Sequence, residues 1–354
     1  MIAAPASPIA ALAPAVIAWQ RSHGRHSLPW QGTRDPYRVW LSEIMLQQTQ
    51  VATVLGYFER FLQHFPDVSA LAAAELDAVL AQWAGLGYYS RARNLHRCAQ
   101  AVMGEFGGQF PRTAAQLQTL PGIGRSTAAA IAAFCFGERA AILDGNVKRV
   151  LTRALGFGED LAMAAHEKAL WDLAEQALPL GGKGIETYTQ GLMDLGASVC
   201  SARGPKCDGC ALAALCVARQ QGRPEAYPVK TRKLKRSRRE HALLWLRQGD
   251  AHWLVQRPAK GVWAGLWSLP EFESVDALRS LLGGWPGHST ALPVFTHVLT
   301  HLDLALSPVV HTLPAQARRD TALQQLWPTG RWVAQDELVQ FGLPAPVAKL
   351  LQGR

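Results

Sequence analysis

The stretch of the chain most able to do chemistry is residues 120–150, LPGIGRSTAAAIAAFCFGERAAILDGNVKRV. Pro121, Gly122 and Gly124 supply a tight turn without Cβ atoms in the way, and Ser126 or Thr127 then opens a helix. The free N–H groups of such a helix start can hold a phosphate. The third anchor of a P-loop or of a dinucleotide fingerprint is missing, so both motifs are excluded. An ordinary turn between two helices is the alternative.

Two carboxylates are candidates for catalysis, one upstream of this stretch and one within it. Glu43 lies among apolar residues in VWLSEIMLQQ, where a carboxylate is costly unless it is solvated, paired or employed. Asp144 precedes Asn146-Val147-Lys148, and its simplest role is the N-cap of a helix. Lys148 follows Asp144 by one helical turn and either pairs with it or lies on the surface. For Glu43 the simple alternative is a surface position.

Four of the six cysteines form a cluster with the spacing C-x6-C-x2-C-x5-C: Cys200, Cys207, Cys210 and Cys216. We expect an intracellular chain, in which disulfides are disfavoured, so the cluster predicts a metal centre. A single CxxC flanked by lone cysteines suits an iron–sulfur cluster somewhat better than zinc, which remains the alternative. Cys98 and Cys135 lie apart in alanine-rich helical sequence and are expected to be packing residues.

Length and charge indicate about two domains in 354 residues. The net charge is +9, and the run KTRKLKRSRR at residues 230–239 carries seven of the positive charges with no acid. Such a run is a solvated linker, a nucleic-acid contact, or both. The apolar N-terminal stretch has no basic n-region, and no uninterrupted apolar run reaches about 18 residues. We therefore expect no signal peptide and no membrane span.

The pattern of apolar residues changes along the chain. Up to about residue 220 it has helical spacing, whereas HALLWLRQ, a Gly249-Asp250 turn and HWLVQRP predict a β-hairpin beyond residue 240. A short helix is expected near VDALRSLL. VFTHVLTHLDLAL predicts one strand with His297, His301 and Asp303 on the same side, as metal ligands or as a polar strand face.

Together, these stretches resemble adenine DNA glycosylases of the MutY type, within the helix-hairpin-helix glycosylase superfamily. The matching segments follow the family's order: LPW, SEIMLQQTQV, GLGYYSRARNL, LPGIGRSTA, ILDGNVKRV, the cysteine cluster and AGLWSLPEF. The resemblance implies a mainly α-helical catalytic region with a [4Fe–4S] cluster subdomain, and a C-terminal α+β domain of Nudix-like fold. The expected boundaries are 1–222 (with the helix-hairpin-helix at about 117–130 and the cluster motif at 200–216), 223–239 for a basic linker, and 240–354.

The resemblance also implies roles for individual residues. Glu43 matches the family's general acid, Asp144 the anionic group that stabilises the sugar cation, and Asn146 a position beside that aspartate. Cys200, Cys207, Cys210 and Cys216 match the cluster ligands. The DNA-binding and base-binding positions are Trp30 near the base pocket, Gln48 and Tyr88 as wedges, Gly122, Gly124 and Ser126 in the hairpin, Gln190 toward adenine, and Thr300 and His301 toward the lesion.

Two positions depart informatively from related patterns. Ser126 stands where relatives that also cut the DNA backbone place a lysine, which implies a monofunctional enzyme that leaves an abasic site. Leu299-Thr300-His301 stands where the family usually has Phe-Ser-His for recognising 8-oxoguanine. A Nudix hydrolase motif matches only in Gly265, Glu271 and Arg279, because SLLGGWP lacks the glutamates that hold magnesium.

The sequence therefore predicts a monomeric intracellular DNA repair enzyme, cytoplasmic and nucleoid-associated if bacterial, with no membrane partner. Its substrate is double-stranded DNA containing adenine opposite 8-oxoguanine or guanine, from which it excises the adenine. The alternatives are an endonuclease-like pyrimidine glycosylase with lyase activity, a non-catalytic iron–sulfur DNA-binding protein, and an electron carrier.

Overall fold

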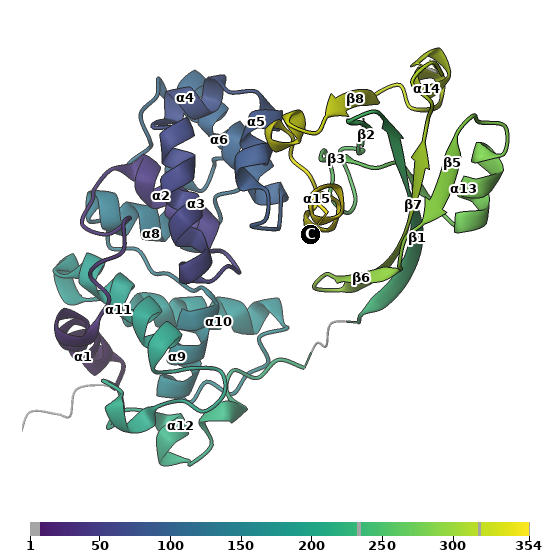
Figure 1. The fold of residues 1–354 in the computed structure, drawn as a ribbon. Helices are drawn as coiled ribbons and strands as arrows, with labels where there is room; N and C mark the ends of the chain where they lie inside the picture. Colours follow the sequence, from purple (N-terminus) through teal and green to yellow (C-terminus); the bar gives the residue numbers. More distant parts are fainter. Residues whose placement is uncertain (1–7, 232–234, 318–319, 354) are drawn as a thin grey trace, which may run out of the picture. The chain divides into compact units, whose positions relative to one another are not determined.

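The computed structural model describes residues 8–231, 235–317 and 320–353 (Figure 1). Arg232 and Lys233, within the expected basic linker, lie outside the described residues. The chain divides into two compact units. The first unit comprises residues 1–58, 67–72 and 97–233, and the second unit comprises residues 59–66, 73–96 and 234–354.

Helices dominate the chain up to residue 226, as the apolar spacing predicts, and this expectation is confirmed. They are α1 (Pro8–His23), α2 (Pro36–Leu46), α3 (Val51–His64), α4 (Val68–Ala73), α5 (Leu76–Trp83), α6 (Ser90–Phe106), α7 (Ala114–Leu117), α8 (Arg125–Phe136), α9 (Gly145–Leu155), α10 (Ala164–Gln176), η1 (Leu180–Gly182), α11 (Ile185–Ser198), η2 (Cys207–Gly209), α12 (Val217–Gln220) and η3 (Pro224–Ala226).

The helices that position the candidate site have well-defined ends. The Asp35 side chain caps α2 by accepting from the N–H of Tyr37, and Pro36 occupies the first turn. Helix α9 begins after Asp144, whose side chain accepts from the N–H of Val147 at 2.8 Å. The N-cap expected for Asp144 is therefore confirmed, which fixes the backbone of the aspartate at the start of α9.

The core of the first unit forms where α1, α8, α9, α10 and α11 meet. Its buried members include Val16, Val147, Leu151, Leu170 and Leu192. Helices α9 and α11 approach closely at Gly196, where a Cβ atom would come within 2.6 Å of the Cβ of Asn146. This close approach brings the start of α9 against the helix that carries Gln190.

A mixed sheet organises the second unit. Its strands are β1 (Ser237–Gln248), β2 (Ala251–Gln256), β3 (Trp267–Ser268), β4 (Glu271–Phe272), β5 (His288–Ala291), β6 (Phe295–Val298), β7 (Leu302–Thr312) and β8 (Arg331–Ala334). The main order is β3-β2-β1-β7-β5, with β1 and β7 parallel and the other pairs antiparallel. The remaining helices are α13 (Val275–Leu282), α14 (Asp320–Leu326), η4 (Glu337–Gln340) and α15 (Ala345–Leu351).

Two sequence predictions for this unit are confirmed and one is wrong. The β1–β2 hairpin turns at Gly249-Asp250, and α13 covers VDALRSLL. The single strand predicted through VFTHVLTHLDLAL is instead the antiparallel pair β6 and β7. The N–H of Leu299 donates to the carbonyl of Leu302 at 2.8 Å, closing a two-residue turn at Thr300-His301. No glycine, proline or asparagine marks this turn, so the alternating pattern continues through it.

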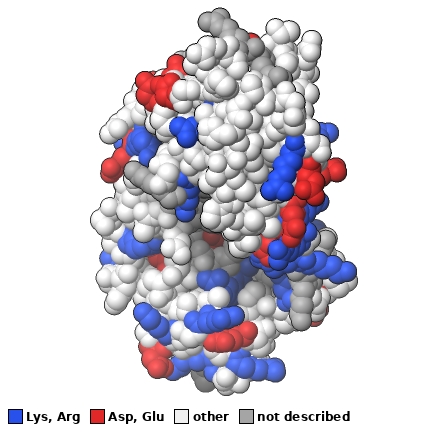
Figure 2. All heavy atoms as spheres, turned by 45° about the vertical axis from the view of Figure 1, so that its right-hand side comes forward, with Lys and Arg blue, Asp and Glu red and all other residues white. Residues whose placement is uncertain are grey.

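Charged side chains of both signs lie on the face drawn in Figure 2, in which lysine and arginine are blue. Several of the described ones form ion pairs, such as Lys168 with Asp172 at 3.2 Å. Among the described residues, no helix is both long enough and apolar enough to span a lipid bilayer.

Candidate active site and cysteine centre

A cleft of about 1330 Å³ in the first unit brings together most of the predicted site residues. Both carboxylates and several predicted DNA contacts line it: Trp30, Glu43, Gln48, Ser126, Asp144, Asn146 and Gln190. These residues come from three separate segments, residues 30–48, residues 126–146 and Gln190. Only the tertiary packing of the first unit makes them neighbours.

Glu43 lies on α2, lines the cleft and is half-buried, while the next two residues on the helix, Ile44 and Met45, are buried. Burial raises the pKa of Glu43 to about 8, and the charge of Asp144 adds to the rise. The surface position considered for Glu43 is therefore wrong. A carboxyl group with this pKa is protonated near neutral pH and can act as a general acid.

Asp144 has a different environment at the start of α9. Burial raises its pKa, but hydrogen bonds from the N–H groups of Val147 and Asn146 act in the opposite direction, as do the charges of Arg149 and Lys148. The ion pair considered between Lys148 and Asp144 is not the one formed, because the Lys148 ammonium pairs with Glu167. The donors around Asp144 favour its anionic form.

Asn146 does not contact Asp144 through its side chain in any hydrogen bond of the described structure. Instead its Oδ1 accepts from Arg149 Nη2 at 2.8 Å. The same guanidinium donates to the carbonyls of Gly196 at 2.7 Å and Cys200 at 2.6 Å. Arg149 thus joins the start of α9 to the segment that enters the cysteine cluster.

The predicted wedge Gln48 and the predicted pocket residue Trp30 have contrasting settings. Gln48 is exposed just beyond α2 and has φ 57°, a backbone conformation that side-chain-bearing residues adopt rarely and often at functional sites. Trp30 is 8% exposed and packs edge-on against Phe58, with ring centroids 5.3 Å apart.

The predicted hairpin lies between α7 and α8. Gly122 has φ 78° and Gly124 is the N-cap of α8; both glycines are exposed, whereas Ile123 between them is 4% exposed. This arrangement anchors the turn through Ile123 and leaves the glycine backbone accessible to a ligand. Ser126 lines the cleft, and its Oγ accepts from the N–H of Leu143 at 3.0 Å.

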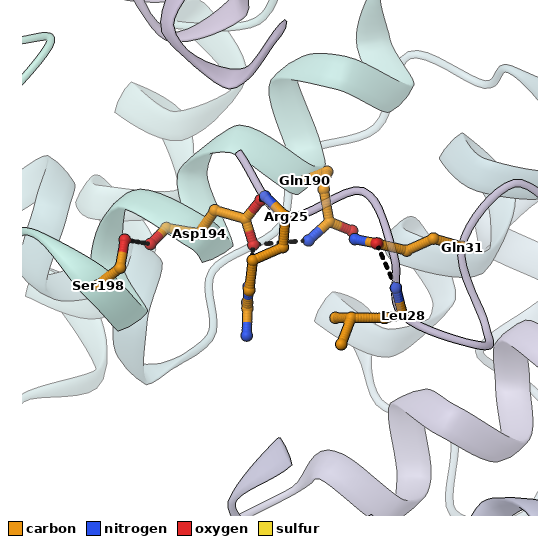
Figure 3. Close-up of polar contacts among 6 residues, drawn as sticks. All are labelled: Arg25, Leu28, Gln31, Gln190, Asp194 and Ser198. Carbon is orange, nitrogen blue, oxygen red and sulfur yellow. Dashed lines mark hydrogen bonds and ion pairs between the residues drawn. The ribbon is translucent and has the colours of Figure 1, made fainter. Parts of the chain in front are cut away.

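Gln190 lies on α11 and is held by a neighbour that sequence reasoning missed (Figure 3). Its Nε2 donates to Asp194 Oδ1 at 2.9 Å. Asp194 is 1% exposed and forms an ion pair of 2.7 Å with Arg25. An acid within the apolar stretch GLMDLGA, one helical turn after Gln190, was the available sequence signal, since a carboxylate buried by such neighbours needs a partner.

The four predicted cysteines line one small cavity in the first unit, together with Arg153. All four thiols are free of disulfides. Burial raises the pKa of Cys210 to about 11, and the charges of the other three thiols act in the same direction. The set therefore fits a group that binds thiolates and offsets their charge, as an iron–sulfur cluster does.

Arg153 is the second residue that sequence reasoning missed. It is 2% exposed, and its Nη1 donates to Cys200 Sγ at 3.3 Å and to the Ser201 carbonyl at 2.7 Å. Its Nη2 donates to the Ala202 carbonyl at 3.1 Å and its Nε to the Tyr227 carbonyl at 3.2 Å. An arginine within the apolar face of α9 was the sequence signal.

The remaining predicted residues belong to the second unit. Tyr88 has φ 48° and is 43% exposed, and its hydroxyl lies 2.8 Å from Thr300 Oγ1. Thr300 and the exposed His301 form the β6–β7 turn. Arg236, in the described part of the basic run, donates to the Thr300 carbonyl at 3.3 Å and pairs with Asp303. Tyr88, the second predicted wedge residue, therefore contacts the turn that is predicted to recognise the lesion.

Other polar residues singled out in the second unit have structural partners. Glu271, from the partial Nudix motif, forms an ion pair with Arg257. His297 packs against Trp263 with ring centroids 5.7 Å apart, while Asp303 pairs with Arg236. Among the described residues, no three His, Cys, Asp or Glu side chains are arranged so that they could hold one metal ion, so His297, His301 and Asp303 are not a shared set of metal ligands. The four cysteines likewise do not surround a single ion, which favours a larger group such as an iron–sulfur cluster over one zinc ion.

Comparison with known proteins gives two family matches. A model described as HhH-GPD superfamily base excision DNA repair protein matches residues 41–176, and a NUDIX domain model matches residues 241–353. A solved thermostable thymine-DNA glycosylase has a TM-score of 0.54 at 29% identity, covering 60% of this chain and 97% of its own. These matches confirm the predicted helix-hairpin-helix and Nudix folds, whereas the iron–sulfur subdomain stays a prediction.

Two full-length relatives are informative. The adenine DNA glycosylase of Homo sapiens is 34% identical over 403 residues, covering 95% of this chain and 72% of the human one. That of Buchnera aphidicola subsp. Acyrthosiphon pisum is 35% identical over 343 residues, covering 95% of each chain. Since both relatives are more than 30% identical and are matched over 95% of this chain, the chain belongs to the adenine DNA glycosylase family.

Proposed function

We propose that this adenine DNA glycosylase excises adenine opposite 8-oxoguanine or guanine in double-stranded DNA and leaves an abasic site. The observation that carries the proposal is the pairing of Glu43 and Asp144 in one cleft, with the pKa of Glu43 raised to about 8 and Asp144 surrounded by donors. Breaking a C1′–N bond needs an acid at the base and an anion near the sugar.

In the proposed mechanism, protonated Glu43 donates its proton to a ring nitrogen of the extruded adenine. The C1′–N bond then breaks, and its electron pair leaves with the base. Asp144 stabilises the positive charge that develops on the sugar, and a water molecule adds at C1′ with loss of a proton. Protonation of the leaving group contributes about 10²- to 10⁴-fold to such a reaction.

The extruded base needs a pocket, and side chains must fill the gap that it leaves in the base stack. The cleft lined by Trp30 and Gln190 is large enough for a purine nucleotide. Gln48 and Tyr88 are proposed as the side chains that fill the gap, because both are exposed and both hold an unusual positive φ. The glycines of the hairpin, Gly122 and Gly124, are proposed to grip a DNA phosphate through accessible backbone.

Ser126 supports the proposal that the enzyme is monofunctional, which means that it excises the base without cutting the DNA strand. A lyase activity requires an amine that forms a Schiff base with the sugar, and at this place the cleft presents a hydroxyl engaged with Leu143. Thr300 and His301 are proposed to contact the base opposite adenine, from the turn that joins β6 to β7.

Cys200, Cys207, Cys210 and Cys216 are proposed to hold a [4Fe–4S] cluster. A bound cluster would link the four cysteines and so hold the segment 200–216 together. Arg149 donates to the Cys200 carbonyl and to Asn146, so that segment supports the start of α9 and the Asp144 cap. Purified protein that is colourless and contains stoichiometric zinc would replace this assignment with a zinc site.

The deciding experiment is single-turnover cleavage of a duplex with one A:8-oxoguanine pair, with and without alkali, beside an A:T duplex and Asp144→Asn. We expect strand breaks only after alkali, none from A:T, and almost none from the variant in the time that the wild type needs to complete the reaction. Breaks without alkali, with a borohydride-trapped DNA adduct, would instead support the lyase. Folded, cluster-loaded protein that binds the duplex without any breaks would indicate a non-catalytic DNA-binding protein.

A further inference from the structure

The buried carboxylate of Asp194 accepts hydrogen bonds from Arg25 and Gln190 (Figure 3), and both of these residues line the cleft. Its Oδ2 accepts from the backbone N–H of Arg25 at 2.9 Å, and its Oδ1 accepts from Arg25 Nε at 2.7 Å. The same Oδ1 accepts from Gln190 Nε2 at 2.9 Å. Arg25 therefore fixes the carboxylate from two directions, and the carboxylate in turn holds the amide of Gln190.

This arrangement determines which end of the Gln190 amide is available to a ligand. An ion-paired carboxylate only accepts hydrogen bonds, so it selects the amide nitrogen of Gln190 and excludes the carbonyl oxygen. The oxygen must then occupy the other end of the amide. Gln190 lines the cleft, and its free end is consequently an acceptor.

Gln31 is oriented in a complementary way. Its Oε1 accepts from the N–H of Leu28 at 3.1 Å, so its Nε2 is the end left over. This nitrogen is buried and has no hydrogen-bond partner within the described chain, which is rare for a buried donor. Figure 3 shows the Gln31 amide beside that of Gln190, on the side away from Asp194, and both residues line the cleft.

We propose that Asp194, held by Arg25, is a positioning residue for base selection, because it presents the Gln190 carbonyl oxygen to the exocyclic amino group of adenine. Gln31 Nε2 supplies the matching donor to an adjacent ring nitrogen. A purine with a carbonyl at the same carbon would place oxygen against oxygen. This inference rests on the proposed function and adds the residues that enforce its choice of base.

The test compares adenine with purine, which lacks the amino group, each opposite 8-oxoguanine in single-turnover excision by the full chain. Asp194→Asn offers an amide donor in place of the carboxylate, so Gln190 is free to turn. We expect the adenine-to-purine rate ratio to fall about tenfold or more, the worth of one buried hydrogen bond. Adenine and purine also differ as leaving groups, but this difference is the same for every variant. It therefore cancels when the adenine-to-purine ratio of a variant is compared with that of the wild type.

Gln190→Met removes the amide without disturbing the pair between Arg25 and Asp194. It should lower the ratio as much as Asp194→Asn does, and the double variant should lower it no further. Asp172→Asn is the matched control, because it makes the same substitution at an exposed ion pair with Lys168 and does not line the cleft. Its ratio should equal that of the wild type.

An unchanged ratio in Gln190→Met, or in folded Asp194→Asn, overturns the proposal even if the rates themselves fall. If Asp194→Asn does not fold, Arg25→Met decides, because the partly exposed Arg25 bonds the same oxygen as Gln190. A normal ratio there overturns the positioning role. A wild-type chain that excises no adenine contradicts the proposed function. Excision by the wild type with an adenine-to-purine ratio that the substitutions do not change contradicts this inference alone.

Discussion

Glu43 on α2 and Asp144 at the start of α9 line one cleft, and the charge of Asp144 adds to burial in raising the pKa of Glu43 to about 8. The two carboxyl groups differ because their surroundings differ. Burial raises the pKa of both groups, but backbone N–H groups and two cations act in the opposite direction on Asp144 alone. Such a division separates a proton donor from an anion at the same pH.

The excision rate should depend on the protonation of Glu43. With a pKa of about 8, the rate should be nearly constant between pH 6 and pH 7 and should fall about tenfold per pH unit well above pH 8. Single-turnover rates measured from pH 6 to pH 9.5 on an A:8-oxoguanine duplex test this. A rate that still rises above pH 9 would show that Glu43 is not the acid.

Glu43→Gln should stabilise the folded chain while it removes activity. The folded pKa of about 8 lies above the ordinary value of 4.5, so the folded state retains a proton that the unfolded state has lost between these values. The free energy of unfolding of the wild type therefore falls as pH rises through this window. Thermal melts should show the greatest advantage of the variant near pH 8 and little difference below pH 4.5. Equal melting temperatures at pH 8 would contradict the buried, protonated state of Glu43.

Substitutions of Asp144 should separate its cap from its chemistry. Asparagine caps a helix as well as aspartate does, so Asp144→Asn should keep the hydrogen bond to Val147 and nearly wild-type stability. Asp144→Ala removes the cap, so its free energy of unfolding should fall by about 1 kcal/mol. Both should lose about 10²- to 10³-fold or more in excision rate, the usual worth of a group that stabilises developing charge. Denaturant melts and single-turnover rates measure the two effects, and an active, stable Asp144→Asn would refute the assignment.

The hydrogen bond of 2.8 Å between Tyr88 and Thr300 should contribute to lesion preference. Thr300→Val removes the hydroxyl at nearly constant volume and should weaken the preference for 8-oxoguanine over guanine by about 2- to 10-fold. Tyr88→Phe should act in the same direction. Combining the two should be less than multiplicative if they act through the shared bond. Rates on A:8-oxoguanine and A:G duplexes give the ratio, and a ratio that stays unchanged in both variants would exclude Thr300 from lesion recognition.

Arg153→Met should weaken the cysteine centre. The substitution leaves the Ser201, Ala202 and Tyr227 carbonyls without their donor and removes a positive charge beside Cys200. A loss of about 1–3 kcal/mol per stranded buried acceptor is usual. We expect a lower melting temperature and less iron and sulfide per chain. Arg203→Met, at an exposed position in the same segment, is the control and should change neither. Full cluster content and stability in Arg153→Met would show that its contacts are dispensable.

Local patterns in the sequence were sufficient for much of this protein. Apolar residues at helical spacing, the Asp144 cap and the Gly249-Asp250 hairpin all depend on neighbours a few positions away, and all are present in the structure. The motifs also placed the chain in its family, because each motif keeps its residue types and order along the chain. The turn at Thr300-His301 was missed because it lacks the residues that usually mark a turn.

Tertiary packing decided what the side chains do. The sequence left open whether Glu43 lies on the surface and whether Lys148 pairs with Asp144, since both questions depend on residues far along the chain. Arg153 and the Arg25–Asp194 pair went unnoticed for the same reason, because their partners lie 47 and 169 positions away. A carboxylate or guanidinium acquires its pKa, its partners and its orientation from the atoms that folding brings around it, and these atoms come from segments that no local pattern connects.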